Sequence, residues 1–580
     1  MMSISAPSLL RKALALALAS LSIGVATPTL AQDNSPAGLR AEAFEAAQWA
    51  ITSDASEALT RMSARFAQGD DALGQLVEER EALSARRDTL ERTVERLHAA
   101  TSPSAALVET GSAYGTAVDR IGAIDAEIEA RFPAYSELTR PQALSIAETQ
   151  GLLRDNEALL LILVNPEATY VWGVSRDRVE WAKAETLGDA AMTAAVTRLR
   201  EALAGTAAST RTDIDPTLFA ARPVTPFDRA LSYRLYAELI APVEAVFEGK
   251  TTLMTVVTGA LTALPLSVLS TQAPVTETTS IDGDPLAITP WLIDRYALAS
   301  LPSVSSLKAL RCHLVDPGRQ AATCPARTAA QTVRERPAGA SQLVAFGAPI
   351  LNGLPSTDTR GAPATDAVSS TSALADVAKL RALPALPGSR LELETLKTRY
   401  PSALIRMGAD ATEKAVRLTD ADALSNARFI VFSTHGLMAG ASATEPGLVL
   451  TPPDQATTAD DGYLTASEAA QLKLNADFVV LSACNTAASD GQPGAEGLSG
   501  LARAFFYAGA RSVLVSHWEV SDAATTTLIT GTFSEMDWNT ENDPGARARA
   551  LQAGIRAVRA EHRWQHPAYW AAFTLVGEPG

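Results

Sequence analysis

The sequence has little of several features that would point to a function directly. Of its 580 residues only three are cysteines and 6% are aromatic, and 65 acidic residues outnumber 49 basic ones. The formal net charge of −16 disfavours nucleic acid or an anionic membrane surface as the main partner. We therefore expect no nucleic-acid partner. The length and the ordinary globular composition instead predict several domains.

Motifs of several large enzyme classes are also missing. The chain has no Gly-x-Ser-x-Gly elbow, no phosphate-binding loop and no His-Glu-x-x-His or paired-cysteine ligand set. His562 and His566 are spaced i,i+4, but a metal site needs further ligands. The sequence argues against serine hydrolases and nucleotide-dependent enzymes, and it indicates no metal and no cofactor.

Long apolar runs are absent outside the N-terminus. Arg11-Lys12 precedes an apolar stretch from Ala13 to Val25, and Thr29-Leu30-Ala31 then places small residues where a signal peptidase cleaves. The stretch is shorter than the roughly 20 apolar residues of a membrane span, so a signal peptide is favoured over a membrane anchor. We expect export with cleavage near Ala31, a periplasmic or secreted protein, and no membrane span in the mature chain.

Export would place the three cysteines in an oxidising compartment. Cys312 and Cys324 lie close in sequence in a loop-rich region, so a disulfide between them is permitted there. Cys484 is then the remaining thiol. In a reducing compartment all three would be thiols, and Cys484 is then also interpretable as a small core residue.

Two short apolar runs in the C-terminal third end in reactive residue types. Residues 429–436 read Phe-Ile-Val-Phe-Ser-Thr-His-Gly, and residues 478–485 read Phe-Val-Val-Leu-Ser-Ala-Cys-Asn. Such runs predict buried strands of a parallel sheet, whose carboxyl ends gather binding and catalytic groups at one edge. His435 and Cys484, separated by 484 − 435 = 49 positions, are expected to meet at that edge.

These two blocks resemble those of the caspase-like cysteine peptidases (caspases, separases, gingipains, legumains). In caspases the catalytic His lies about 50 residues before the Cys. The finer resemblance is to the CHAT domain, the separase-like bacterial branch. It extends over roughly Phe227 to Gly580 and continues in residues 496–505, 508–510, 518–522 and 566–573. The implied fold is an α/β, caspase-like parallel-sheet sandwich, with an inactive front half packed on an active one.

The resemblance implies a cysteine endopeptidase that acts on a protein or peptide substrate. The Cys484 thiolate would attack the peptide carbonyl, and His435 would act as acid and base. The backbone N–H groups of Gly436 and Cys484 are the expected oxyanion donors. Because the family requires no third residue, we predict a dyad.

Substrate selection depends on acidic residues near the site. Separase-like enzymes hold a basic side chain, just before the cleaved bond, with an acidic residue that follows the last catalytic strand. Asp522 stands at the matching place, where a carboxylate pairs well with Arg or Lys. It is equally well placed to cap a helix that starts at Ala523. Three further candidates for substrate binding are Asp490, Glu496 and Glu519, whereas His517 is interpreted as a packed residue at a strand end.

The patterns divide the chain into five parts: a signal peptide (1–31), a helical domain (32–150), a strand meander with one helix (151–226), and the front (227–340) and catalytic (341–580) halves of the CHAT region. Strands are predicted over 159–164, 169–174, 178–181, 253–257, 343–347, 403–406 and 512–516.

Leucines recur every seven residues from Leu76 to Leu97 in the helical domain. Arg80 and Arg87 occupy alternate core positions, which favours an antiparallel helical hairpin over a dimerising coiled coil. This domain is where a regulatory protein partner is expected to bind.

Two other functions fit the same residues. One is a catalytically silent caspase-fold interaction module, against which the intact His–Cys pair argues. The other is a peptide ligase or transferase that passes the Cys484 thioester to an amine. In each case the expected partner is a protein or peptide, and a substrate would be held as an added strand beside the sheet.

Overall fold

The structure is a computed structural model that describes residues 35, 38–49, 76, 79–80, 83, 87, 90, 105–131, 143–204, 226–274, 286–308, 310–311, 341–353, 374–437, 446–483, 486, 500–536 and 543–580. The chain divides into two compact units, Met1–Ala43 and Phe44–Gly580. Several predictions fall outside the described residues: the signal peptide, the Cys312–Cys324 disulfide, and the site residues Cys484, Asp490 and Glu496.

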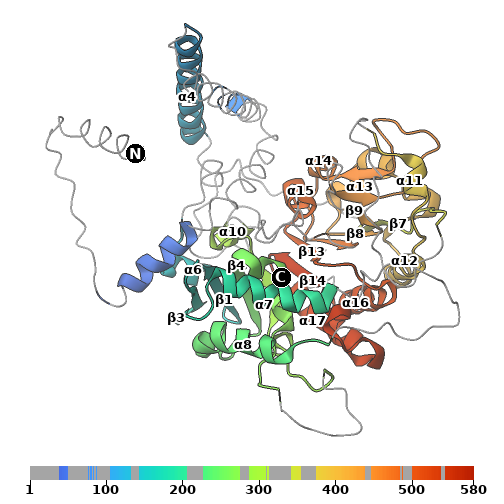
Figure 1. Ribbon diagram of the computed structural model, residues 1–580. Coiled ribbons are helices and arrows are strands. Elements are labelled where there is room, and N and C mark those ends of the chain that lie inside the picture. Colours follow the sequence, from blue (N-terminus) through green and yellow to red (C-terminus); the bar gives the residue numbers. More distant parts are fainter. Residues whose placement is uncertain are drawn as a thin grey trace, which may run out of the picture. The chain divides into compact units, whose positions relative to one another are not determined.

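An 11-stranded, mostly parallel sheet forms the centre of the larger unit (Figure 1). Its strand order is β3-β2-β1-β4-β5-β14-β13-β12-β8-β6-β7. The strands are β1 (Glu157–Val164), β2 (Thr169–Ser175), β3 (Val179–Ala184), β4 (Thr252–Val257), β5 (Ala297–Ser300), β6 (Leu343–Gly347), β7 (Leu404–Met407), β8 (Phe429–Ser433), β12 (Phe478–Ser482), β13 (Ser512–Ser516) and β14 (Phe573–Gly577). The predicted α/β class is confirmed.

The front strands and the C-terminal strands share this one sheet. Strands β1, β2 and β3 form the predicted antiparallel meander, and β1 also pairs in parallel with β4. Strands β5 and β14 meet at the pair Ser300–Val576. The sheet is therefore continuous across the sequence boundaries at 226 and 340.

The C-terminal strands have a chain reversal that marks a binding edge. The chain runs from β6 outward to β7, then returns to β8 on the other side of β6 and continues through β12 and β13. These five strands are parallel, and β14 runs antiparallel to β13. In open α/β sheets, ligands bind beyond the carboxyl ends of the strands at such a reversal. Here that point lies between β6 and β8.

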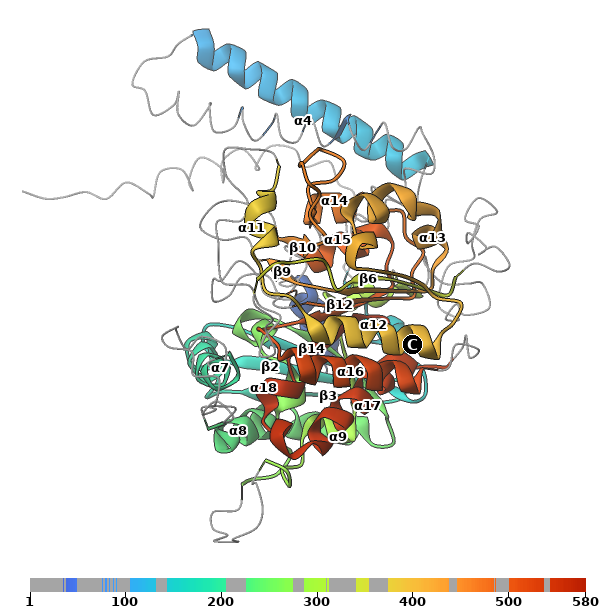
Figure 2. The ribbon, with the colours of Figure 1, turned by 90° about the vertical axis from the view of Figure 1, so that its right-hand side faces the viewer.

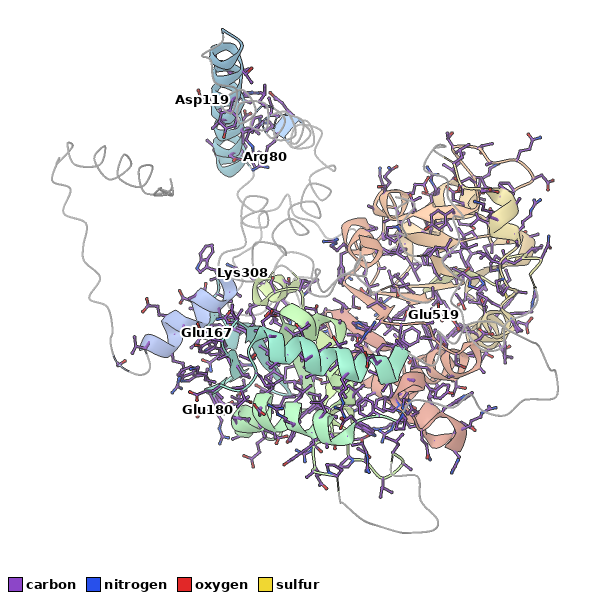
Figure 3. All side chains as sticks on the ribbon, viewed as in Figure 1. Arg80, Asp119, Glu167, Glu180, Lys308 and Glu519 are labelled. Carbon is purple, nitrogen blue, oxygen red and sulfur yellow. The ribbon has the colours of Figure 1, made fainter. Side chains whose placement is uncertain are left out.

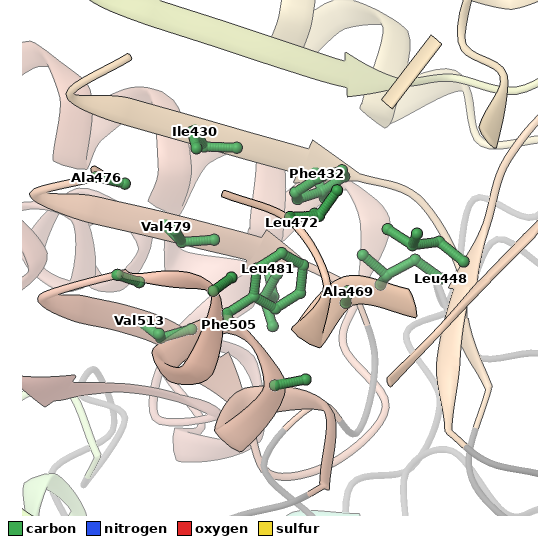
Figure 4. Packing of buried hydrophobic residues seen from close by; sticks show 14 of the residues in the cluster. Ile430, Phe432, Leu448, Ala469, Leu472, Ala476, Val479, Leu481, Phe505 and Val513 are labelled. Carbon is green, nitrogen blue, oxygen red and sulfur yellow. The ribbon is translucent and has the colours of Figure 1, made fainter. Parts of the chain in front are cut away.

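Alternating apolar residues bury one face of these strands. Ile430 and Phe432 of β8, with Val479 and Leu481 of β12, are fully buried in one cluster. Helices α14 (Ala466–Ala470) and α15 (Gly500–Ala508) cover this face and contribute Ala469 and Phe505 (Figure 4). Burial of each Val, Leu, Ile or Phe side chain in this cluster contributes about 1.5–3 kcal/mol to the stability of the fold.

Two long helices cover the opposite face. Helix α12 (Pro387–Arg399) packs on β6, β7 and β8, and α16 (Asp522–Glu535) lies beside it (Figure 2). Proline at the start of α12 suits the first helical turn, where its missing N–H is not needed.

The predicted N-terminal helical region is present. In α4 (Ala105–Arg131), Ile121, Ile124 and Ile128 share a buried face. Arg80, labelled in Figure 3, pairs with Asp125 at 2.6 Å, which joins α4 to an earlier helical segment. Within the described part of the chain, no helix is long and apolar enough to cross a membrane.

Candidate active site

His435 lies just beyond the carboxyl end of β8, at the chain reversal, and is fully buried. Strands β8 and β12 are in register up to the pair Ser433–Ser482. His435 follows Ser433 by two positions, as Cys484 follows Ser482. The register thus sets the two chain segments level with each other, whereas Cys484 itself lies outside the described residues.

A backbone carbonyl orients the His435 ring. Nε2 of His435 lies 2.7 Å from the carbonyl oxygen of Pro384. Because a carbonyl only accepts hydrogen bonds, Nε2 carries the hydrogen in the neutral ring, and Nδ1 holds the lone pair that can take a proton. This orienting group could not be predicted from the sequence, since a main-chain oxygen has no side-chain signature.

The N–H of Gly436 points out of a small sheet that begins there. Strands β9 (Gly436–Leu437), β10 (Gly447–Val449) and β11 (Tyr463–Thr465) form this sheet. The N–H of Val449 donates to the carbonyl of His435 at 3.0 Å. Because bonded and non-bonded pairs alternate in antiparallel ladders, the next pair, Gly436–Leu448, is non-bonded. The Gly436 N–H is therefore directed away from β10, as an oxyanion donor requires.

One turn of α12 holds the ends of both strands. Ser389 donates its hydroxyl to the carbonyl of Ser433 at 2.5 Å and accepts from the N–H of Ala348 at 2.9 Å. Glu392, fully buried, accepts from the hydroxyl of Ser482 at 3.1 Å. These two residues, spaced i,i+3 on the helix, fix the ends of β8 and β12 from one face.

Asp522 does not cap a helix that starts at Ala523. Helix α16 begins at Asp522 itself, and its N-cap is Ser521, whose side chain accepts from the N–H of Ala524. The Asp522 carboxylate, only 2% exposed, instead accepts from the N–H of Gly388 at 2.6 Å. The capping alternative is therefore wrong: Asp522 lies at the positive N-terminus of α12, where Leu386 supplies no side-chain cap.

The other described candidates lie on the segment between β13 and α16. Glu519 is partly buried there (Figure 3). The ring of His517 is buried, with Nε2 3.0 Å from the hydroxyl of Thr574. Burial, together with the nearby Arg200, lowers the pKa of His517 to about 3, so the ring stays neutral near pH 7. The packed role predicted for His517 is confirmed.

Among the described residues, no group of three His, Cys, Asp or Glu side chains could hold a metal ion. His566 instead accepts from the N–H of Ala568 through Nδ1 at 3.2 Å and caps the short helix α18 (Pro567–Trp570).

Fold and site together define an α/β protein with a histidine at the reversal of a parallel sheet and a cysteine after the neighbouring strand. The chain belongs to the CHAT domain family, whose model matches residues 229–578, more than half of it.

Relatives in other organisms match smaller parts of the chain. Tetratricopeptide repeat protein 28 of Mus musculus is 36% identical over 115 residues, 20% of this chain and 4% of the mouse protein. The human protein of that name is 36% identical over 114 residues, again 4% of its length. The chain thus spans a very small part of these relatives.

Two solved structures are similar in part. The separase of the Saccharomyces cerevisiae separase–securin complex matches at a TM-score of 0.40 and 11% identity, over 81% of this chain and 34% of separase. Gingipain R, an Arg-specific cysteine proteinase, matches at a TM-score of 0.31 and 12% identity, over 67% of this chain and 74% of gingipain.

Proposed function

We propose that this chain is a cysteine endopeptidase in which Cys484 is the nucleophile and His435 the acid and base. The observation that carries the proposal is the geometry of His435, whose ring lies at the sheet reversal with Nε2 bonded to the Pro384 carbonyl, which makes Nδ1 the basic nitrogen of the neutral ring. Membership of the CHAT domain family supports the same chemistry.

The reaction divides into two steps. The Cys484 thiolate forms a C–S bond with the scissile carbonyl carbon, and the negative charge on the carbonyl oxygen is met by backbone N–H donors, one of them from Gly436. His435, which holds on Nδ1 the proton taken from the Cys484 thiol, then delivers it to the amine nitrogen as the scissile C–N bond breaks. In the second step His435 takes a proton from water, the hydroxide attacks the thioester, and the carboxylic acid leaves as the thiolate is restored.

We assign the selection of the substrate to Asp522. Its carboxylate lies where the amino ends of α12 and α16 meet, at the same edge as His435. A carboxylate there suits a guanidinium or ammonium group, so the cleaved bond would follow Arg or Lys. Glu519, on the segment that leads to Asp522, is a second acidic candidate for binding the same basic side chain of the substrate.

The decisive experiment is cleavage of a randomised peptide library by the chain lacking residues 1–31, run beside Cys484→Ala. Cuts that disappear in the variant, each after Arg or Lys, support the full proposal. Cuts after other residues contradict the role of Asp522 alone. If neither protein cleaves and a thiol-reactive probe does not label Cys484, the silent interaction module is favoured.

A second arm tests the transferase alternative. Adding a peptide with a free amine to the same reaction would yield a ligated product if the thioester is passed to the amine. A hydrolysed product alone supports the peptidase.

We also propose export, on the pattern of residues 11–31. Expressed from the full coding sequence in a bacterium, the chain should be recovered from the periplasm or medium with Gln32 as its first residue. Non-reducing peptide mapping of that material would test the Cys312–Cys324 disulfide. Recovery of uncleaved chain from the cytoplasm would contradict the proposal.

A further inference from the structure

The ends of β12 and β13 are joined by side chains near the proposed nucleophile. The β12–β13 ladder contains the pairs Val479–Val513 and Val480–Leu514. Ser516 lies two positions beyond the second pair, at the carboxyl end of β13, and is fully buried. The link between the strands at this end therefore depends on the contacts of Ser516.

Ser516 contacts the residues on both sides of Cys484-Asn485. Its hydroxyl donates to the carbonyl of Ala483 at 2.5 Å and accepts from the N–H of Thr486 at 3.4 Å. The N–H of Ser516 donates to the hydroxyl of Thr486 at 2.8 Å. Ala483 and Thr486 are both buried, so water does not compete for these bonds.

We propose that Ser516 is a positioning residue for the nucleophile: by holding Ala483 and Thr486 it sets the backbone that carries Cys484. This inference rests on the proposed function, since it assigns Ser516 to the same site. Ala483 directly precedes Cys484 in the sequence and Thr486 follows it by two positions, so loss of these bonds would release the backbone on both sides of the nucleophile. Small displacements at a reacting group have large effects on rate, because catalysis depends on near-attack geometry.

The same strand supplies a matched control. Ser512, at the amino end of β13, is also fully buried, and its hydroxyl donates to the carbonyl of Asp477 at 2.8 Å. Ser512→Ala and Ser516→Ala thus each remove one buried hydroxyl that donates to a main-chain carbonyl. They differ in their place: Ser512 lies at the end of the strand away from Cys484.

The experiment compares kcat and KM of the two variants on a peptide that the parent cleaves. Ser516→Ala should lower kcat about 10- to 100-fold with KM within about threefold, since it removes positioning and not substrate contacts. Ser512→Ala should change kcat and KM each by less than about threefold. A similar loss of thermal stability in both variants, with the kcat loss confined to Ser516→Ala, supports positioning. Equal kcat values for both would overturn it.

A second pair of variants guards against misfolding of Ser516→Ala. Thr486→Val removes the hydroxyl that accepts from Ser516 at constant shape, and Thr486→Ser retains it. Thr486→Val should lower kcat and Thr486→Ser should restore most of it. The double variant Ser516→Ala/Thr486→Val should be little worse than the more damaged single variant, because both act through one set of bonds. Independent, multiplicative losses would overturn the proposal.

A readout that does not need turnover separates this inference from the proposed function. In a Cys312→Ser/Cys324→Ser background, the rate at which iodoacetamide alkylates Cys484 reports how the thiol is positioned. A change of about fivefold or more in Ser516→Ala, with Ser512→Ala unchanged, supports positioning even if the chain cleaves no peptide. An unchanged rate in a folded Ser516→Ala would overturn it, whatever the outcome for peptidase activity.

Discussion

The N–H of Gly388 lies 2.6 Å from Oδ2 of Asp522, so the first turns of α12 and α16 share one buried carboxylate. The contact is possible because residue 388 has no side chain: a Cβ there would lie 2.4 Å from Oδ2 and 2.5 Å from Cγ of Asp522. The carboxylate is buried against the first turn of α12. Residue 388 therefore controls where the candidate specificity residue lies.

Gly388→Ala should displace Asp522 and lower the free energy of unfolding by about 1–3 kcal/mol, the usual cost of overpacking. Urea denaturation measures this change. Gly115→Ala is the matched control, because nothing lies within 4 Å of a Cβ at that position of α4. It should leave stability unchanged or raise it by up to about 1 kcal/mol. Equal effects of both variants would contradict the close packing of Asp522 on Gly388.

Asp522→Asn tests whether this carboxylate also selects substrate. If it pairs with a basic side chain, kcat/KM for Arg- and Lys-containing peptides should fall about 100-fold, because the amide has no charge to offer the cation. The comparison is Glu519→Gln, a neutralisation on the same segment that should cost less than about tenfold. Competition between Arg and Gln peptides measures the preference directly. A loss of stability with the Arg preference intact would leave Asp522 a purely structural role.

The strands could be predicted because buried parallel strands have continuous apolar runs in their sequence. Residues 343–347 and 512–516 form strands with the predicted bounds, and most others differ by one or two residues. The reversal between β6 and β8 and the junction of β5 with β14 were not predicted, since strand order arises from packing and not from local pattern.

The site was predictable in its histidine but not in the groups that orient it. Residues that bear reactive side chains stand out at strand ends, as His435 does. The carbonyl of Pro384, the hydroxyl of Ser516 and the carboxylate of Glu392 act through contacts between segments far apart in sequence. Ser and Glu are common residues, so nothing in the sequence distinguishes these two from any others.

The neutral ring of His435 should be the Nε2–H tautomer. Its Nε2 faces the Pro384 carbonyl, and the opposite tautomer would place two lone pairs against each other at 2.7 Å. ¹⁵N NMR of histidine-labelled protein above pH 8 separates the two tautomers by the shifts of the ring nitrogens. The signal is assigned by its loss in His435→Gln, one of six histidines in the chain. An Nδ1–H pattern would contradict the proposed role of Nδ1 as the base.

A buried ionic network, distant in sequence from the candidate active site, should control the free energy of unfolding at low pH. Arg311, fully buried, donates to Glu157 at 2.8 Å and to Glu578 at 3.0 Å. Arg311→Met should therefore cost about 3–5 kcal/mol, because it leaves two buried carboxylates without that cation. Arg176→Met is the control: its pair with Asp155 is exposed and should contribute less than about 1 kcal/mol.

The acid dependence of this network has a defined sign. Burial alone would raise the pKa of Glu157, but attraction and hydrogen bonds to Arg311, with those to Arg154, outweigh it and leave the pKa below its usual value. A depressed folded pKa gives stability that is present above the unfolded pKa of about 4.5 and is lost as the pH falls through the folded value. The stability difference between parent and Arg311→Met should therefore narrow below about pH 4.5, as measured by urea denaturation.

The contribution of Glu413 to stability should depend on pH with the opposite sign, and in a different pH range. Burial raises its pKa to about 7, and nearby Glu468 and Asp461 add to this, against hydrogen bonds from the N–H of Asp461 and from Arg417. Because the folded pKa is raised, the contribution of Glu413 is fully present below the unfolded pKa of about 4.5 and is lost as the pH rises through about 7. The shift corresponds to about 3 kcal/mol.

Glu413→Gln removes this titration. The variant should therefore gain stability relative to the parent as the pH rises from about 5 to 8, by up to about 3 kcal/mol. Urea denaturation of both proteins at several pH values measures the gain, and Glu394→Gln, an exposed glutamate on α12, is the control that should show none. Since the Arg311 network acts below about pH 4.5 and Glu413 acts above it, the two slopes can be separated in one titration. A flat difference between Glu413→Gln and the parent across this range would show that the carboxylate is ionised throughout, held by Arg417 and the N–H groups of Asp461 and Gly462.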